Sequence, residues 1–361
     1  AGAQRTVPET STCVFLSPNL DQPDMIDQST SLRSFTAVLA AVAFLAVGVA
    51  GCGGGSSSGG SADGGDPGTS QTLNMVTVNW IEGMAFTYAQ EQILEDSLGM
   101  TVDVKEVQGG GIAFKSVADQ ERDYFNEAWL PTTHKEPWNE TKGDADKLGY
   151  MYKGTSVGLT VPAYMDITSV TELSEVREGL EGEINGIESG AAVNDQTRQI
   201  LENNGIEGFD VVPASGPATW QALESAINNQ EPIVVTGWYP HWKWGSYDLK
   251  YLEGAQTGQS PVFGAPEDVF KIVDSEFTEE FPKDAVCFLK VSEVNDAQIE
   301  SLMDTFRNRG DMDKSAAAAQ WVENNPDIIN GWMDQTEECV ASDGPVQTLP
   351  DDATYSREQG A

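Results

Sequence analysis

The chain has 361 residues, with 57 acidic against 20 basic side chains and a formal net charge of −37. Binding to nucleic acid and attachment to an anionic lipid surface both need clustered lysine and arginine, so this balance argues against both. With two histidines and four cysteines we expect no metal site, and no motif points to another cofactor. The 39% of hydrophobic residues can fill the cores of about two domains of roughly 150 residues each.

The N-terminal segment is typical of an export signal. Arg33 precedes an uncharged apolar run, residues 34–50, which is shorter than the about 20 apolar residues of a membrane-spanning helix. The run leads into Val-Ala-Gly-Cys, residues 49–52, which resembles the lipobox of bacterial lipoproteins. We therefore expect cleavage before Cys52 and lipidation of that cysteine. An uncleaved membrane anchor is the alternative, and in both cases the rest of the chain is exported.

The segments on either side of Cys52 give the first domain boundaries. We expect residues 1–51 to be the signal peptide. Met25 lies where a signal of ordinary length would begin, so we interpret residues 1–24 as an over-extended gene start. Residues 52–72 are rich in glycine, serine and aspartate and have almost no apolar side chain to pack. Such a composition predicts a flexible tether.

Strands and helices alternate from Leu73 onward. Apolar residues recur at helical spacing in residues 85–98, and Gly99 ends that helix. The first group of elements comprises strands at 73–80, 101–107 and 124–129 and helices at 85–98 and 112–122. The second group comprises strands at 156–161, 183–188, 209–213 and 232–238 and helices at 192–204 and 219–230. This alternation predicts two α/β lobes with parallel strands, followed by a mostly helical segment at 296–333.

No catalytic constellation stands out along these elements. The two histidines, His134 and His241, lie in no GxSxG, HExxH or comparable motif, and there is no Walker loop. Three glycines, residues 109–111, form a turn before a helix, which alone is very weak evidence for phosphate binding. We therefore expect a protein that is not an enzyme.

Three tryptophans lie where predicted strands end: Trp80, Trp129 and Trp238. Core packing is the usual role of a single tryptophan. Three at the rim of a sheet are harder to assign to packing, because loops at that rim hold ligands. Converging indole faces suit a quaternary ammonium, which offers methyl groups and no hydrogen-bond donor. Each desolvated face contributes about 2 kcal/mol, so three give about 6 kcal/mol.

Five segments around these tryptophans closely resemble the glycine-betaine-binding proteins of osmoprotectant ABC transporters. The resemblance runs from about Leu73 to Pro282, and the segments agree in order and spacing: WIEGMAFTYAQEQILEDSLG (80–99), NEAWLPTTHKEPW (126–138), GLTVP (158–162), GIESGAAV (186–193) and EPIVVTGWYPHWKWGSYDLKYLE (231–253). It implies an α/β, bilobal type II periplasmic-binding-protein fold with a ligand cleft between two α/β lobes. We expect lobe 1 at 73–158 and 261–345, lobe 2 at 159–260, and a disordered tail at 346–361.

The resemblance also implies a binding site. In this family a cage of three tryptophans holds the trimethylammonium group, and the matching positions here are Trp80, Trp129 and Trp238. The ligand carboxylate is held by a histidine, here His134, and by backbone N–H groups near Ala192 and Val193, where a helix opens; a helix N-terminus suits an anion on physical grounds. Many relatives have Gly-Ile where this chain has Ala192 and Val193, and the backbone N–H donors are the same in both cases. His241 also belongs to the family pattern, and we interpret it as structural.

The expected function is that of an extracytoplasmic lipoprotein, a monomer held to the membrane only through its lipid. It captures glycine betaine or a related trimethylammonium zwitterion and delivers it to an ABC permease for osmoprotectant uptake, at the cell membrane or in the periplasm. Choline or carnitine is the nearest alternative ligand, and choline lacks the carboxylate that an anion clamp serves. Alternatives of other classes are a secreted carbohydrate-active enzyme with tryptophan platforms and a structural surface lipoprotein.

Cys287 and Cys339 are the other thiols of the exported part besides Cys52. Export places them in an oxidising compartment, where an even pair usually forms a bridge. We expect a disulfide between them that closes a loop of about 50 residues and ties the helical C-terminal segment to its lobe. Two separate buried thiols are the alternative.

Overall fold

The computed structural model of this chain describes residues 71–354. The predicted signal peptide, the lipidation of Cys52 and almost all of the predicted tether lie outside these residues. The described residues belong to one compact unit. None of their helices is long and apolar enough to cross a membrane.

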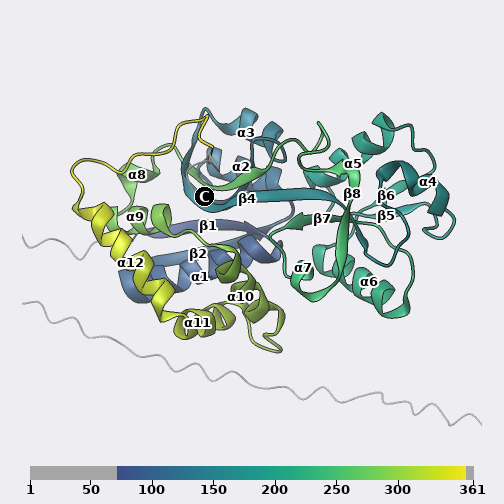
Figure 1. Cartoon of the computed structure of the whole chain (residues 1–361). Coiled ribbons are helices and arrows are strands. Elements are labelled where there is room, and N and C mark those ends of the chain that lie inside the picture. Colours follow the sequence, from purple (N-terminus) through teal and green to yellow (C-terminus); the bar gives the residue numbers. More distant parts are fainter. Residues whose placement is uncertain (1–70, 355–361) are drawn as a thin grey trace, which may run out of the picture. The chain divides into compact units, whose positions relative to one another are not determined.

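The first part of the described chain folds into the predicted β-α-β-α-β arrangement (Figure 1). Its elements are β1 (Thr72–Val78), α1 (Ile81–Leu98), β2 (Thr101–Val107), α2 (Gly110–Ala118), β3 (Tyr124–Leu130) and the short α3 (Lys135–Thr141). β1 pairs in parallel with β2 on one side and with β3 on the other. Parallel strands bring their carboxyl ends to one edge of the sheet, and Trp80 and Trp129 lie at that edge.

One long strand, β4 (Ala145–Pro162), connects the two halves of a single sheet (Figure 1). Residues 145–155 pair with the antiparallel strand β9 (Glu267–Asp274), and residues 156–162 pair with β7 (Val235–Tyr239) and β8 (Leu249–Gln256). The strand order is β2-β1-β3-β9-β4-β7-β5-β6, with β8 on β4. The sequence pattern predicts only the second part of β4. The change of partners after Thr155 lies three residues before the lobe boundary predicted at 158.

The second half of the sheet carries the remaining elements of the middle of the chain. They are the 3-10 helix η1 (Val170–Glu172), α4 (Leu173–Val176), β5 (Glu183–Asn185), α5 (Ala192–Asn203), β6 (Asp210–Val212), α6 (Gly216–Asn229) and α7 (Lys243–Ser246). β5 pairs in parallel with β6 and β7. We call β1–β3, β9, residues 145–155 and the helices packed on them the first lobe. The second lobe comprises residues 156–162, β5–β8 and α4–α7.

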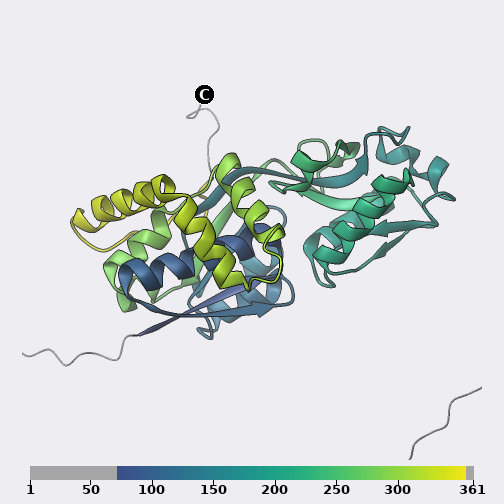
Figure 2. The same ribbon diagram turned by 90° about the horizontal axis from the view of Figure 1, so that it is seen from below.

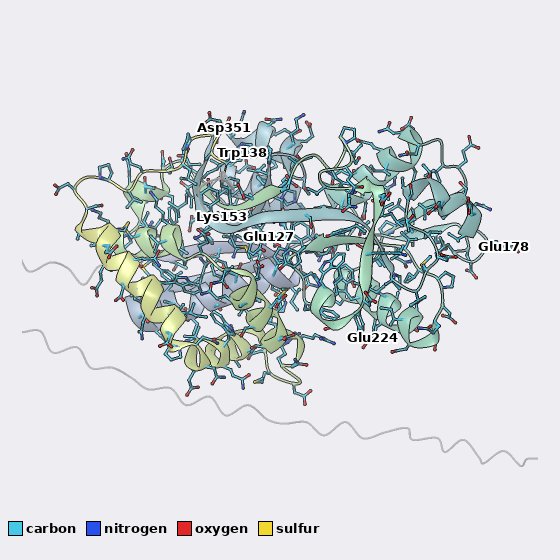
Figure 3. The ribbon with its side chains drawn as sticks, viewed as in Figure 1. Glu127, Trp138, Lys153, Glu178, Glu224 and Asp351 are labelled. Carbon is cyan, nitrogen blue, oxygen red and sulfur yellow. A yellow bond between two sulfur atoms is a disulfide. The ribbon has the colours of Figure 1, made fainter. Side chains whose placement is uncertain are left out.

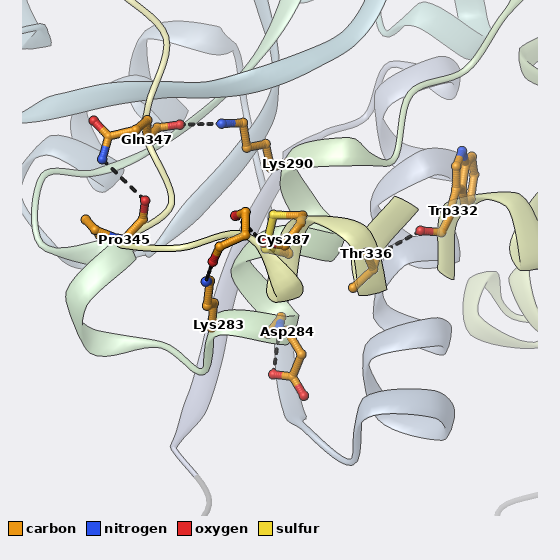
Figure 4. The surroundings of a disulfide bond; sticks show 11 residues. Lys283, Asp284, Cys287, Lys290, Trp332, Thr336, Pro345 and Gln347 are labelled. Atoms are coloured by element: carbon orange, nitrogen blue, oxygen red, sulfur yellow. Dashed lines mark hydrogen bonds between the residues drawn. A yellow bond between two sulfur atoms is a disulfide. The ribbon is translucent and has the colours of Figure 1, made fainter. Parts of the chain in front are cut away.

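The C-terminal helices return to the first lobe. They are α8 (Phe277–Glu280), α9 (Lys283–Val291), α10 (Asp296–Arg307), α11 (Lys314–Asn324) and α12 (Pro326–Ala341). α10 and α11 pack on α1, and α12 packs on α9 (Figure 2). A disulfide joins Cys287 of α9 to Cys339 of α12, with the two Cα atoms 5.8 Å apart (Figure 4). The sequence pattern does not predict α9, whose central residues are almost entirely buried.

The last described residues correct the prediction of a disordered tail from residue 346. Leu349 forms a β-bridge with Lys147. The indole Nε1 of Trp138 donates to the carboxylate of Asp351 at 2.7 Å; both residues are labelled in Figure 3. The Lys147 Nζ donates to the Asp351 carbonyl at the same distance. Residues 346–354 are therefore packed against the first lobe, through partners that lie about 200 positions earlier in the sequence.

Candidate ligand-binding site

A pocket of about 390 Å³, counting space open to solvent, lies between the two lobes. The first lobe contributes Trp80, Glu82, Trp129, Thr133 and His134, and the second contributes Val157, Ile187, Ala191, Ala192, Val193 and Trp238. All six residues predicted to meet a ligand therefore line one pocket. The lining is mostly apolar with a few polar groups, as in small-molecule sites.

The three tryptophans are held by the ends of strands. Trp80 follows β1 and forms the N-cap of α1, Trp129 lies near the end of β3, and Trp238 lies in β7. Each side chain is at least 93% buried, yet each contributes to the pocket wall. Well-packed rings of this kind lose little freedom when a ligand enters, so their faces are presented in a fixed arrangement.

His134 is fixed by its own backbone neighbour. The backbone N–H of Trp129 donates to His134 Nδ1 at 3.0 Å, and the ring stacks on Trp80 with 5.6 Å between centroids. Burial lowers the pKa of His134 to about 4. The imidazole is therefore neutral at pH 7, and because Nδ1 accepts a hydrogen bond the proton resides on Nε2. The ring thus offers a single N–H donor, at Nε2.

The second group of donors is the N-terminus of α5, a helix of 12 residues. Ala191 is the N-cap, and no side chain caps the helix. Neither the N–H of Ala192 nor that of Val193 has a hydrogen-bond acceptor within residues 71–354. Unpaired N–H groups and the positive end of the helix dipole make such a terminus a site for an anion.

Two glutamates complete the surroundings of the cage. The indole Nε1 of Trp80 donates to Glu188 Oε2 at 3.1 Å, and the indole Nε1 of Trp238 donates to Glu82 Oε1. Burial raises the pKa of Glu82 to about 7, while the nearby Lys243 and the Trp238 hydrogen bond act in the opposite direction. One pocket thus joins aromatic faces, whose indole N–H groups are bonded to two carboxyl groups, to a set of N–H donors. This combination suits a cation and an anion in one small molecule.

Residues 71–324 match the model of the substrate-binding domain of ABC-type glycine betaine transport systems. The chain belongs to this family. The glycine betaine/carnitine transport binding protein GbuC of Listeria monocytogenes is 28% identical over 169 residues, which are 45% of this chain and 53% of that protein. The match therefore spans about half the length of that relative.

Solved structures are similar over most of the chain. Lactococcal OpuAC, in its closed-liganded conformation with glycine betaine, is 29% identical with a TM-score of 0.65, over 73% of this chain and 99% of that one. An ABC-transporter choline binding protein in complex with choline is 25% identical with a TM-score of 0.66, over 76% and 99%. These relatives are transport binding proteins, so this member of the glycine betaine family is not an enzyme and the carbohydrate-active alternative is set aside.

The remaining sequence candidates lie outside the pocket of this glycine-betaine-family protein. His241 is fully buried with its ring centroid 4.6 Å from that of Trp220 and 5.2 Å from that of Trp238, and burial holds its pKa well below the usual range. The three glycines at 109–111 open α2, where Gly110 lies against His134. Within residues 71–354, no cluster of three or more histidine, cysteine or acidic side chains could hold a metal ion.

No sequence pattern assigns a role to the residues that support the cage. Glu82 lies two residues after Trp80, and Glu188 lies inside the GIESG turn. Each accepts a hydrogen bond from a tryptophan more than 100 positions away. Their positions next to recognised motifs are a signal, but many acids are spread along this chain and proximity alone does not single them out.

Proposed function

We propose that this chain captures glycine betaine or a related trimethylammonium zwitterion for an ABC importer. The observation that carries the proposal is the joint lining of one pocket by three indole rings, the Nε2–H of His134 and the N-terminus of α5. The rings accept the trimethylammonium group, with about 6 kcal/mol from three faces. The N–H groups donate hydrogen bonds to the carboxylate and bring the total to about 8 kcal/mol, the free energy of a micromolar site.

Titration calorimetry tests this assignment with glycine betaine, proline betaine, carnitine, choline and maltose as ligands. We expect a betaine to bind with a dissociation constant near micromolar and maltose to show no heat of binding. Choline should bind more weakly, because it has no carboxylate for His134 and α5. Saturable binding of maltose without binding of any trimethylammonium compound would contradict the proposal.

Choline is the second candidate, and one observation favours it. Glu82 lines the pocket, and apart from the neighbouring carboxyl group of Glu127 its buried Oε2 has no hydrogen-bond partner within the described part of the chain. A hydroxyl group on the ligand would supply a donor to that oxygen. His134→Ala separates the two candidates, because it should weaken betaine strongly and leave any choline binding almost unchanged.

We further propose that the protein is an extracytoplasmic, monomeric lipoprotein that delivers its ligand to a permease in the membrane. The basis is the sequence pattern that ends in Val-Ala-Gly-Cys52 and the family to which the chain belongs. Mass spectrometry of the native protein should find a diacylglyceryl-modified N-terminal cysteine. A mature protein whose N-terminus lies upstream of Cys52, or one exported without lipid, would refute lipidation but not the binding function.

A further inference from the structure

Two cage tryptophans donate hydrogen bonds to glutamates of the opposite lobe. Trp80 belongs to the first lobe and donates its indole N–H to Glu188 of the second. Trp238 belongs to the second lobe and donates to Glu82 of the first. Both carboxyl groups are buried, with exposed fractions of 2% for Glu82 and 7% for Glu188. The two hydrogen bonds therefore run in opposite directions between the lobes.

Glu188 is held in place without touching the pocket. Its Oε2 accepts from Trp80, and its Oε1 accepts from the backbone N–H of Gly216 at 2.8 Å, where α6 begins. Each oxygen thus has a donor, and the carboxyl group cannot rotate without losing one of them. Since Glu188 is absent from the pocket wall, any effect on a ligand must pass through Trp80.

Trp238 has a positive neighbour as well as a negative one. The Lys243 Nζ lies 4.5 Å from the centroid of the Trp238 ring and donates to the Trp238 carbonyl at 3.3 Å. Burial lowers the pKa of Lys243 well below its usual range, and in its protonated form this group competes with a ligand cation for the same π electrons. Glu82, bonded to the N–H of that ring, counters this effect.

A carboxyl group that accepts a hydrogen bond from an indole N–H fixes the position of the ring and also changes the electron density of the ring. Charge-assisted hydrogen bonds are stronger than neutral ones, and bonded groups polarise one another in a medium of low dielectric constant. Polarisation of the N–H toward a negative acceptor moves electron density into the ring. The attraction of the ring face for a cation rises with that density.

We propose that Glu82 and Glu188 are positioning residues that determine specificity, because they fix the rings of Trp238 and Trp80 and favour a charged trimethyl group over an uncharged one of the same shape. This inference rests on the proposed function. It assigns to each glutamate an effect that is transmitted through an indole N–H, and it predicts that the effect depends on the charge of the ligand head.

The test compares glycine betaine with 3,3-dimethylbutyrate, in which carbon replaces the quaternary nitrogen. The two ligands share the trimethyl shape and the carboxylate, so the ratio of their affinities isolates the contribution of the positive charge. Calorimetry on the full chain should show that Glu188→Gln lowers betaine affinity about fivefold and dimethylbutyrate affinity less than about twofold, a loss within the usual range of cation–π energies. Glu82→Gln should act in the same way from the other lobe.

Two controls make the result specific. Glu178→Gln, an exposed acid just after α4 at the far end of the second lobe (Figure 3), removes the same charge away from the cage indoles and should leave the ratio unchanged. In a Trp80→Phe background, which has no N–H, Glu188→Gln should change the ratio much less than it does in the wild type. Circular dichroism verifies folding, and the Glu82 and Glu188 variants test the claim independently if one of them fails to fold.

The outcomes separate this inference from the proposed function. Equal losses for both ligands in the Gln variants would overturn the inference, as would an unchanged ratio or a full Glu188 effect in the Trp80→Phe background. In those cases a wild type that prefers betaine would still support the proposed function. A wild type that binds neither ligand would overturn both.

Discussion

At the residue scale, Gly110 lies so close to the His134 ring that a side chain at this position would collide with it. The Trp129 N–H donates to Nδ1 at one edge of the imidazole, and a Cβ placed on Gly110 would lie 3.0 Å from Nε2. A contact of this length forces the neighbour to move by a few tenths of an ångström. The neighbour here is the atom that carries the donor proton, so the absence of a side chain at Gly110 protects the carboxylate end of the site.

Gly110→Ala should therefore weaken glycine betaine binding about fivefold, or about 1 kcal/mol. Gly111→Ala is the matched control, because no atom lies within 4 Å of its added Cβ and Gly111 is in the same helix. That control should bind as the wild type does and should be slightly more stable, since alanine is favoured over glycine in a helix. Equal affinities for the two variants in calorimetry would contradict this placement of His134.

Glu82 gives the site a pH dependence with a defined sign. Burial raises the pKa of Glu82 to about 7. Two charged or titratable side chains face it: Glu127 from β3 and Lys243 from the second lobe. The pKa of Glu127 is itself raised well above the usual range by burial and by Glu82. A bound quaternary ammonium favours the ionised form of Glu82, so binding releases a proton. Affinity should therefore rise as the pH increases from 6 to 8.

Calorimetry at pH 6, 7 and 8 checks this expectation. Glu82→Gln should reduce the dependence, because His134, with a pKa of about 4, stays neutral across the range and only the shifted groups of Glu127 and Lys243 remain nearby. An affinity that falls with rising pH in the wild type would show that protonated His134, rather than ionised Glu82, governs the site.

At the element scale, α10 of the first lobe reaches α7 of the second through one side chain. The Arg307 Nη1 donates to the Ser246 Oγ at 3.1 Å, and its guanidinium lies 4.0 Å from the ring centroid of Trp242. Both contacts exist only while the lobes are together. They lower the free energy of the closed form relative to the open one, as a ligand that touches both lobes also does.

Arg307→Ala should shift the ligand-free protein toward an open form and weaken betaine several-fold. Arg309→Ala is the control, because Arg309 donates to the Phe306 carbonyl of its own lobe at 2.8 Å. Small-angle X-ray scattering should show a larger radius of gyration for ligand-free Arg307→Ala alone. Identical scattering and affinity in the two variants would show that the contact has no part in closure.

The disulfide between α9 and α12 stabilises the first lobe and lies outside the binding pocket. Replacing Cys287 and Cys339 by serine together should cost about 3–4 kcal/mol of unfolding free energy in the chain-entropy model, given a separation of 52 residues. Betaine affinity should stay the same. Thermal unfolding and alkylation of denatured, unreduced wild type check this, and two alkylated thiols in the wild type would rule out the bridge.

Elements with local signals could be predicted, and those that depend on distant partners could not. Hydrophobic periodicity and turn residues predict the helix that ends at Gly99 and the β-α-β-α-β order, and the structure has both. The first part of β4 contains Gly149 and Gly154 and lacks a clear alternation, so its pairing with β9 is visible only in the fold. The segment at 346–354 looks disordered by composition, yet it binds Trp138 and Lys147.

The site divides in the same way. The three tryptophans and His134 occupy strand ends and a helix start, positions that sequence can locate. The glutamates that orient the indole groups act across the two lobes, at separations of 108 and 156 residues. No local pattern encodes such a pairing, so only the tertiary structure brings Glu82 and Glu188 to the cage.

At the scale of the whole molecule, capture and closure depend on the same side chains. Trp80, Trp129 and His134 come from the first lobe, and Trp238 and the N-terminus of α5 come from the second. A ligand that binds both sets stabilises the closed arrangement, because the open form offers it only half of these contacts. The closed form is then the state that a permease can distinguish from the empty protein.

The most direct measurement is the titration of Trp129→Ala and Trp238→Ala with glycine betaine, with circular dichroism to verify that each variant is folded. Each ring should contribute about 2 kcal/mol or more, so each variant should bind roughly thirtyfold more weakly or worse than the wild type. Phenylalanine at either position should cost less, because a ring face remains. If both alanine variants are folded and bind betaine as tightly as the wild type, the tryptophan cage does not hold the ligand.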